Sequence, residues 1–324
     1  MFTTSKFLAS TVCVAAALTT GASFAQDAWP ERAVTIIVPW SAGGGTDGTA
    51  RAVAAELEER FGQPFNVVNR TGGGGLVGHS AIMSADSDGY TLGVITIEMS
   101  MYEAQGLSEM SPEDFTFIGR FNADPIAINV GDGSYADAQA LIDDVRADPG
   151  ALSASGANRG GLSHLAWVGL LDRLDIDPMA ANWVASDGSA PALQQLAAGA
   201  IDVVTTSPAE ASALVEAGEA QTLALVSSER SELYPDLPTT TEIFGVDWSP
   251  LPFRGLAAPA GIDESIVETL TEALAEITSD PEFREFMNSQ GFSVAYQDAE
   301  GFATTVQNAY EGLSGTMAAV GLAN

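Results

Sequence analysis

Short apolar stretches alternate along the chain with longer amphipathic ones. Residues 34–38 form a β-branched apolar run that predicts a strand buried on both faces. Three glycines follow, and residues 47–61 then mix apolar and charged positions in the pattern of a helix. The sequence goes on to predict a strand at 65–69, a short helix at 79–85 and a strand at 90–97. This alternation favours a parallel sheet with crossover helices.

The same pattern continues for more than a hundred residues and then becomes helical. It predicts further strands at 126–130, 182–184, 201–205 and 222–226, and a short strand that leads into Ser153. It predicts helices at 136–147, 162–173, 191–198, 209–217, 263–278, 281–289 and 298–311. The Pro-rich segment 249–254 marks a break in composition and a crossing between lobes. A chain of 324 residues exceeds the size at which one core stops growing, so we expect two lobes.

The first 25 residues are predicted to be a signal peptide rather than part of the fold. Lys6 gives a positive start, residues 7–18 are apolar, and Ser23 to Ala25 form a small-x-small cleavage site. The apolar segment is too short to span a bilayer. We therefore expect export and cleavage near Ala25. The only cysteine, Cys13, is lost with this segment, which excludes disulfides, thiolate catalysis and cysteine-ligated metals in the mature chain.

The chain is strongly acidic, with 12 Lys and Arg against 43 Asp and Glu and a net charge of −31. Nucleic acid and anionic membrane surfaces are therefore not expected as partners. The only lysine is Lys6, so the mature chain cannot form a P-loop. His79 and His164 are solitary, without a carboxylate at metal-ligand spacing on a shared helix. We expect neither a metal site nor a Ser-His-Asp triad.

Glycine- or serine-rich loops follow five of the predicted strands. They lie at 41–47, 70–78, 155–161, 186–190 and 205–208. In α/β sheets, ligands bind beyond the carboxyl ends of the strands. Helix starts there offer unpaired N–H groups and the positive end of the helix dipole, and glycine lets an anion approach the backbone closely. The alternative is that the glycines are needed only because tight turns require backbone dihedral angles that other residues avoid. The loop at 41–47 alone does not decide between an anion site and such a turn.

One loop also has a pattern that favours an enzyme. Gly73-x-Gly75-x-x-Gly78, with Glu98 twenty residues beyond, formally matches a dinucleotide-binding fingerprint. Residues 70–71 separate the strand from the glycines, and the following helix is short, both of which oppose the match. An exported dinucleotide-dependent oxidoreductase remains the alternative function.

Several polar residues near these loops have both a structural and a ligand-binding interpretation. Asp47 and Arg51 stand one helical turn apart, the spacing of an ion pair, and Asp47 also stands where a capping residue would. Asn69 at a strand tip is expected to pin the opposite glycine loop. Asp187 either caps the helix that follows or accepts a hydrogen bond from a ligand. His164 either braces the start of its helix or lines the cleft.

The motifs together resemble a known family. Pro39 to Asp47, followed by Ala50-Arg51, resembles the first signature of the tripartite tricarboxylate transporter solute receptors, the Bug or TctC family. Gly62-Gln63-Pro64, Asn69-Arg70-x-Gly72-x-x-Gly75-x-x-Gly78 and Asp88 to Leu92 resemble the second signature. Further matches are Ser155-Gly156, Gly160-Gly161-x-x-His164-Leu165, Pro191-Ala192-Leu193 and Pro238-Thr239 with Glu242. The resemblance spans essentially the whole mature chain.

The resemblance implies an exported, two-lobed α/β receptor of the type II periplasmic-binding-protein fold, each lobe a mainly parallel sheet flanked by helices. On this topology we assign residues 26–126 and 252–324 to lobe 1 and residues 127–251 to lobe 2. The implied protein is a periplasmic monomer without enzymatic activity or cofactor. It closes on a small carboxylate, such as a di- or tricarboxylate or similar organic acid, and delivers it to the permease subunits of a membrane transporter. A ligand-presenting accessory of a membrane sensor kinase is a further alternative.

The resemblance also implies which residues bind the ligand. Main-chain amides and ordered waters of the first two glycine loops would hold the carboxylate, while lobe 2 supplies the discriminating side chains. The near wall would comprise Trp40, Ser41, Ala42, Gly45, Asn69, Gly72, Gly73, Gly74, Gly75 and Thr96. The far wall would comprise Ser155, Asn158, His164, Asp187 and Thr206. Arg159 could pair with a second carboxylate or be a solvated loop residue.

Overall fold

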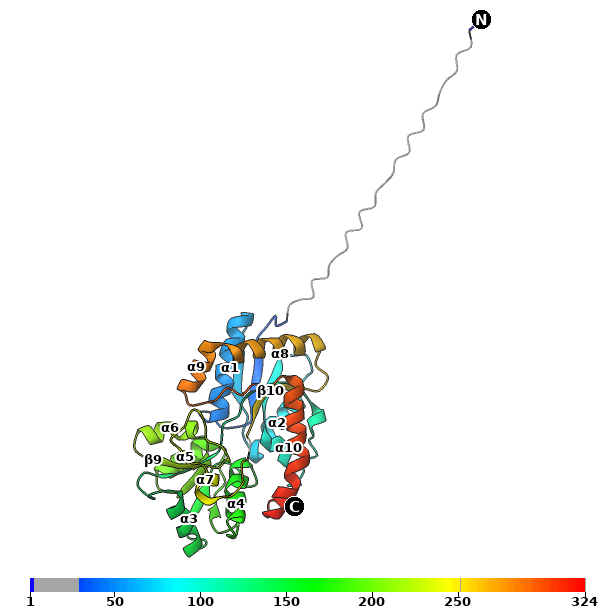
Figure 1. Ribbon diagram of the computed structural model, residues 1–324. Helices are drawn as coiled ribbons and strands as arrows, with labels where there is room; N and C mark the ends of the chain where they lie inside the picture. The colour runs from blue at the N-terminus through cyan, green and yellow to red at the C-terminus, as the bar shows by residue number, and fades with distance from the viewer. Residues whose placement is uncertain (3–28, 251, 324) are drawn as a thin grey trace.

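Two α/β lobes lie one against the other, each built around its own sheet (Figure 1). The computed structural model describes residues 1–2, 29–250 and 252–323. The predicted signal peptide, apart from its first two residues, therefore lies outside the described residues. We call the part of the molecule around the first sheet lobe 1 and the part around the second sheet lobe 2.

The sheet of lobe 1 has five strands in the order β2-β1-β3-β10-β4. The strands are β1 (Val34–Val38), β2 (Phe65–Asn69), β3 (Thr91–Thr96), β4 (Phe115–Asn122) and β10 (Arg254–Pro259). β1 pairs in parallel with β2 and β3, whereas β10 runs antiparallel to both β3 and β4. The strands predicted at 34–38 and 65–69 are confirmed, but β4 and β10 were not predicted.

Helices cover both faces of this sheet because alternate strand residues point to opposite sides. On one face, Ile36 and Leu256 pack in a core with residues of α1 (Gly45–Phe61), α8 (Glu264–Ser279) and α9 (Pro281–Ser289). On the other face, Ile37 and Ala257 pack with residues of α2 (Leu76–Met83) and α10 (Ala299–Ala319). Short 3-10 turns lie at η1 (Gly73–Gly75), η2 (Ile97–Met101) and η3 (Pro112–Asp114).

The sheet of lobe 2 repeats this plan with five strands in the order β7-β6-β8-β5-β9. The strands are β5 (Ala127–Gly131), β6 (Ser153–Ser155), β7 (Asn182–Trp183), β8 (Val203–Thr206) and β9 (Ala220–Leu225). β6 is parallel to β7 and β8, and β5 is antiparallel to β8 and β9. Its helices are α3 (Ala138–Ala147), α4 (Leu162–Arg173), α5 (Ser189–Ala197), α6 (Pro208–Glu216) and α7 (Thr240–Phe244).

Each sheet contains one antiparallel strand among its parallel ones. These strands, β5 and β10, are the first that the chain forms after it passes from one sheet to the other. The two-lobed α/β fold with mainly parallel sheets is confirmed. Several helix boundaries also differ by two or more residues: α1, α2 and α5 begin before the predicted starts and α3 begins after its predicted start, while α2 ends early at Met83 and α10 continues to Ala319.

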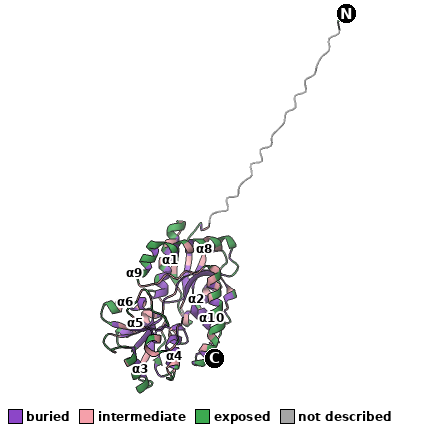
Figure 2. Cartoon of the chain, in the orientation of Figure 1, coloured by how far each residue is buried: buried purple, intermediate pink, exposed green. Residues whose placement is uncertain are grey.

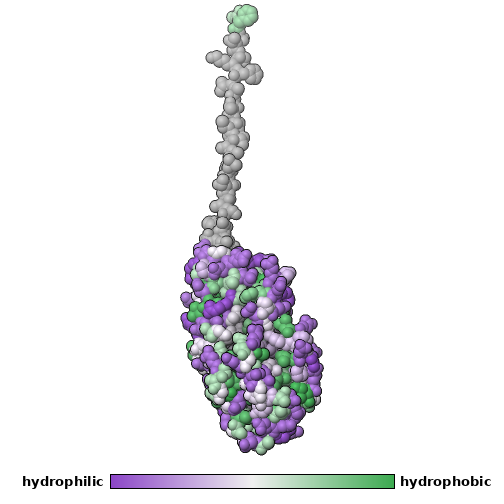
Figure 3. Space-filling model, turned by 90° about the vertical axis from the view of Figure 1, so that its left-hand side faces the viewer, coloured by the Kyte–Doolittle hydropathy of each residue, from purple (hydrophilic) through white to green (hydrophobic). Residues whose placement is uncertain are grey.

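The strands are buried and the outward faces of the helices are exposed (Figure 2). On the face seen in Figure 3, hydrophobic residues occur in small groups among hydrophilic ones. Among the described helices, none has both the length and the apolar character needed to cross a membrane.

Candidate functional site

A cavity lies between the lobes, where three helices begin. Gly45, Leu162 and Ser189 are the first residues of α1, α4 and α5, and all three line it. Lobe 1 contributes Trp40, Ser41, Gly44, Gly45, Thr46, Thr96, Ile97, Glu98, Phe253 and Arg254. Lobe 2 contributes Gly156, Ala157, Leu162, Ser163, Gly188, Ser189, Thr206 and Glu210. The remaining lining residues are Ile126 and Pro252. Because helix starts carry partial positive charge, the cavity attracts negatively charged groups.

The carboxylate of Glu210 bridges the two lobes at this cavity. Its Oε1 accepts the backbone N–H of Gly45 at 2.8 Å and the hydroxyl of Ser189 at 2.7 Å. Its Oε2 accepts the backbone N–H of Ser207 at 3.0 Å and the Thr206 hydroxyl, within the capping box of α6. A Cβ at position 45 would lie 2.6 Å from Glu210 Oε1, so this close approach requires glycine.

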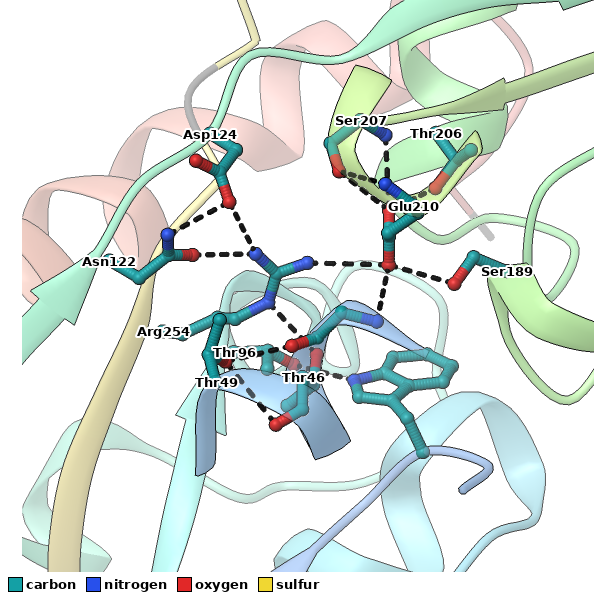
Figure 4. Close-up of polar contacts among 12 residues, drawn as sticks. Thr46, Thr49, Thr96, Asn122, Asp124, Ser189, Thr206, Ser207, Glu210 and Arg254 are labelled. Carbon is teal, nitrogen blue, oxygen red and sulfur yellow. Dashed lines mark hydrogen bonds and ion pairs between the residues drawn. The ribbon is translucent and has the colours of Figure 1, made fainter. Parts of the chain in front are cut away.

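Arg254, the first residue of β10, lies beside Glu210 with its side chain only 11 % exposed (Figure 4). Its Nε donates to Thr46 Oγ1 at 3.0 Å, and its Nη1 donates to Asn122 Oδ1 and to Asp124 Oδ2, the latter at 3.0 Å. Its Nη2 lies 3.5 Å from Glu210 Oε1. The guanidinium is thus placed between two carboxylates, one from each lobe.

This arrangement keeps Glu210 ionised. Burial alone would raise the pKa of Glu210, but the charge of Arg254 and the hydrogen bonds from Thr206, Ser189 and Ser207 outweigh it and hold the pKa below its usual value. The start of α1 therefore already binds a carboxylate, and that carboxylate belongs to the protein.

Glu98, which follows β3 in lobe 1, makes the reciprocal contact with lobe 2. Its Oε1 accepts the N–H of Leu162, the first residue of α4, at 3.3 Å. Its Oε2 accepts the hydroxyl of Thr96 at 2.7 Å, and Thr96 in turn accepts the indole N–H of Trp40 at 3.2 Å. Burial raises the pKa of Glu98, although these hydrogen bonds oppose the rise. Each lobe thus offers one carboxylate to a helix start of the other.

Five of the residues predicted to bind ligand line this cavity: Trp40, Ser41, Gly45, Thr96 and Thr206. Among them, Ser41 has a buried hydroxyl oxygen with no hydrogen-bond partner in the described part of the chain. A hydroxyl in that state is a donor and acceptor for a bound molecule.

The other predicted site residues do not line this cavity. Gly73, Gly74, Asn158 and Asp187 line a second cavity, together with Ala185, Ser186, Pro191 and Gln195. The residues that line neither of these two cavities are Ala42, Asn69, Gly72, Gly75, Ser155, Arg159 and His164.

Asn69 and Asp47 hold the first glycine loop from behind. The Asn69 amide donates to the Trp40 carbonyl and to Asp47 Oδ1, both at 2.9 Å, which confirms the pinning role predicted for Asn69. The predicted Asp47–Arg51 ion pair is also confirmed, at 2.9 Å. Asp47 stands in the first turn of α1 rather than at its cap, and it accepts the N–H of Gly43 at 3.0 Å. These bonds outweigh burial and lower the pKa of Asp47.

His164 braces the start of α4, as one of its two interpretations predicted. Its Nδ1 accepts the N–H of Gly160 at 3.0 Å, and its ring stacks on Trp183 with centroids 4.3 Å apart. Burial, with a smaller contribution from the charge of Arg159, lowers the pKa of His164 to about 3. The imidazole is therefore neutral at physiological pH.

The capping role proposed for Asp187 is wrong. Gly188 is the N-cap of α5 and no side chain caps the helix. The Asp187 side chain is exposed. The Asp187 carbonyl instead accepts the N–H of Ser41 across the lobes at 3.3 Å. Arg159 is likewise exposed.

The glycine run 72–75 is held by a buried chain of hydrogen bonds. All four glycines have positive φ, the left-handed region that other residues avoid. The Tyr102 hydroxyl donates to the Gly74 carbonyl at 3.0 Å and lies 2.7 Å from His79 Nδ1. His79 Nε2 accepts the N–H of Thr96 at 3.3 Å, so Nδ1 holds the proton that it donates to Tyr102. This chain positions the loop without a charged group.

Neither Glu210 nor Arg254 was predicted to belong to the site, and Glu98 was predicted only as part of the dinucleotide pattern. The segment Ser207-Pro208-x-Glu210 carries the signal of a capping box, which fixes where Glu210 points. Arg254 is the first residue of the apolar run of β10, directly after the Pro-rich segment. A charged residue next to a buried strand must have polar partners, and this is the signal that the sequence contains.

Comparison with known proteins gives the family. The model described as the tripartite tricarboxylate transporter family receptor, TctC, matches residues 49–322. The chain belongs to this receptor family. Among curated relatives, a UPF0065 protein from a tcbD–tcbE intergenic region of a Pseudomonas species is 30 % identical over 290 residues, covering 87 % of this chain and 85 % of the relative.

Solved structures of TctC-type receptors have the same fold. The periplasmic binding protein BugD superposes with a TM-score of 0.83 at 25 % identity, covering 91 % of this chain and 99 % of its own. An adipate-bound protein of R. palustris gives 0.86 at 25 % identity, with coverage of 91 % and 99 %. MatC from Rhodopseudomonas palustris with bound malate gives 0.80 at 26 % identity, with coverage of 89 % and 99 %. The family is thus one of periplasmic solute-binding receptors.

Proposed function

We propose that this protein is a periplasmic receptor that binds a small organic acid in the cavity between its lobes and delivers it to the permease of a tripartite tricarboxylate-type transporter. The observation that carries the proposal is the meeting of three helix starts, those of α1, α4 and α5, on one interlobe cavity. Glu210 and Glu98 accept one N–H each from the first two, whereas no side chain caps α5, so an anion can bind there through backbone N–H groups and the helix dipole, without lysine.

The comparisons support an organic acid as the ligand, since adipate and malate are bound by two structural neighbours. We further propose that the lobes are residues 26–126 with 252–324 and residues 127–251, and that the protein works as a monomer. Opening and closing of the lobes about the two crossing segments would admit and enclose the ligand. Ser41, whose buried hydroxyl lacks a partner in the described structure, is the side chain that we assign to the ligand carboxylate.

Thermal unfolding of the purified protein with a panel of mono-, di- and tricarboxylates tests the proposal. A ligand at a hundred times its Kd stabilises the folded state by about 2.7 kcal/mol, which raises Tm by several degrees. Ser41→Ala should weaken binding of the active compound about tenfold, because a hydrogen bond to a charged group is lost. Ser289→Ala, at an exposed position on α9, is the control and should leave affinity unchanged.

Two results would refute the proposal: no carboxylate in the panel raises Tm, or Ser41→Ala binds as well as the wild type. Delivery to a permease has its own assay, uptake of the labelled compound by cells with and without the gene. Unchanged uptake in its absence would reject the transport role while leaving the binding role intact.

A further inference from the structure

The cavity already contains two carboxylates of the protein, each on a helix start of the opposite lobe. Glu210 in lobe 2 accepts the N–H of Gly45 at the start of α1, and Glu98 in lobe 1 accepts the N–H of Leu162 at the start of α4. The two positions that would best stabilise the two ends of a dicarboxylate are therefore occupied by glutamate side chains.

Both carboxylates are fixed by their own lobe, so a ligand cannot displace them without breaking local structure. Glu210 Oε2 completes the capping box of α6 with Ser207, and its side chain is 9 % exposed. Glu98 Oε2 accepts the Thr96 hydroxyl, and Glu98 is 6 % exposed. Each keeps one oxygen, Oε1, directed across the cavity.

The positive charge at the cavity is already paired with carboxylates of the protein. Arg254 is the one Lys, Arg or His among the described residues that line it. Its guanidinium donates to Thr46, Asn122 and Asp124 and pairs with Glu210. At most one of its five N–H groups, on Nη2, is left for a ligand, and the acidic groups around the guanidinium outnumber it.

We propose that Glu210 and Glu98 restrict this receptor to ligands with a single carboxylate, which present a hydroxyl or ammonium group where a dicarboxylate would place its second carboxylate. This inference rests on the function proposed above and narrows its ligand class. The ligand's donor group hydrogen-bonds to Glu210 Oε1 or Glu98 Oε1, and its carboxylate binds Ser41. A second carboxylate about 5 Å from Glu210, at an effective dielectric constant of about 20, is repelled by an amount equal to roughly a hundredfold in affinity.

Calorimetric titration with matched ligand pairs tests this proposal. The pairs are succinate with 4-hydroxybutyrate, glutarate with 5-hydroxypentanoate, and adipate with 6-hydroxyhexanoate, so each pair differs only in one end. For at least one pair, the wild type should bind the hydroxy acid at least tenfold more tightly than the diacid. Glu210→Gln and Glu98→Gln keep the size and the accepting oxygen, and each should reduce this preference about tenfold, mainly by improving diacid binding.

Glu216→Gln is the control, because Glu216 is exposed at the end of the same helix as Glu210. It should leave the preference unchanged, and circular dichroism should show that all three variants fold. Tighter binding of the diacids by the wild type, or equal preferences in wild type, Glu210→Gln and Glu98→Gln, would overturn the proposal and leave the organic-acid receptor standing. Binding of neither member of any pair, together with a carboxylate panel that gives no shift in Tm, would instead reject the receptor function itself.

Discussion

Replacing Arg254 by Met should be among the most damaging single changes to the stability of this protein. The guanidinium is 11 % exposed and lies between Asp124, at 3.0 Å, and Glu210, at 3.5 Å. Met fills much of the same space but leaves two buried carboxylates without their cation. Removing one partner of a buried ion pair costs about 3–5 kcal/mol. In a chain of this length, that loss lowers Tm by roughly 6–15 °C.

Urea unfolding followed by tryptophan fluorescence measures this loss directly. Arg230→Met is the matched control, because the Arg230–Glu242 pair has a contact of similar length, 2.9 Å, but its side chains are 46 % and 44 % exposed. An exposed pair of this kind contributes less than about 1 kcal/mol. Adding Glu210→Gln to Arg254→Met should recover about 1–2 kcal/mol, since one of the two unpaired charges is removed.

The unfolding free energy lost in Arg254→Met should also decrease as the pH falls. Arg254 helps to hold the pKa of Glu210 below its usual value, so this stabilisation is present above the usual glutamate pKa and is lost as pH falls through the lowered one. The difference between wild type and Arg254→Met should therefore shrink below about pH 4. An Arg254→Met variant that loses no more stability than Arg230→Met would refute the assignment of a buried ion-pair network that stabilises the fold.

Two further predictions concern other parts of the fold. Burial lowers the pKa of both His79 and His164 to about 3, so each histidine stays neutral in the folded protein. The free energy of unfolding should therefore be highest above pH 6.5 and should fall as the pH drops, by about 2 kcal/mol per histidine at pH 5. Urea unfolding between pH 6.5 and pH 5 should show half of this loss in His164→Gln, which keeps only one of the two histidines. A variant whose unfolding free energy depends on pH as steeply as that of the wild type would contradict the assignment of a buried, neutral His164. Gly78→Ala should destabilise strongly, because its Cβ would lie 2.5 Å from the Pro39 Cα, whereas Gly312→Ala in exposed α10 should stabilise by about 0.5–1 kcal/mol. Thermal unfolding distinguishes the two, and equal Tm values would refute the steric argument.

Elements with a clean apolar period were predictable from the sequence. The strands at 34–38 and 65–69 and the helices at 162–173 and 281–289 were predicted with the bounds that the structure shows. β4 and β10 were missed for a physical reason. Arg120 interrupts the apolar run of β4, and β10 begins with a charge that is buried only because partners from other segments surround it.

The candidate site was predictable only as far as local sequence determines it. Helix starts at glycine loops, and the Asn69 contact behind one of them, follow from short-range patterns. The Glu210 contact does not, because Gly45 and Glu210 are 165 residues apart and meet only when the lobes face one another. Its role depends on the arrangement of the two lobes, which no local pattern encodes. The same holds for the contact between Glu98 and Leu162, which are 64 residues apart.

The position of β10 has a consequence for how the protein is made. Because β10 lies between β3 and β4, the first sheet stays divided until the ribosome has added residues 254–259, near the end of the chain. All strands of the second sheet, by contrast, lie within residues 127–225 and are complete earlier. Nascent chains that stop before residue 254 would expose the unpaired edges of β3 and β4, which are templates for aggregation. The part of the protein that is translated first is thus the part that is finished last.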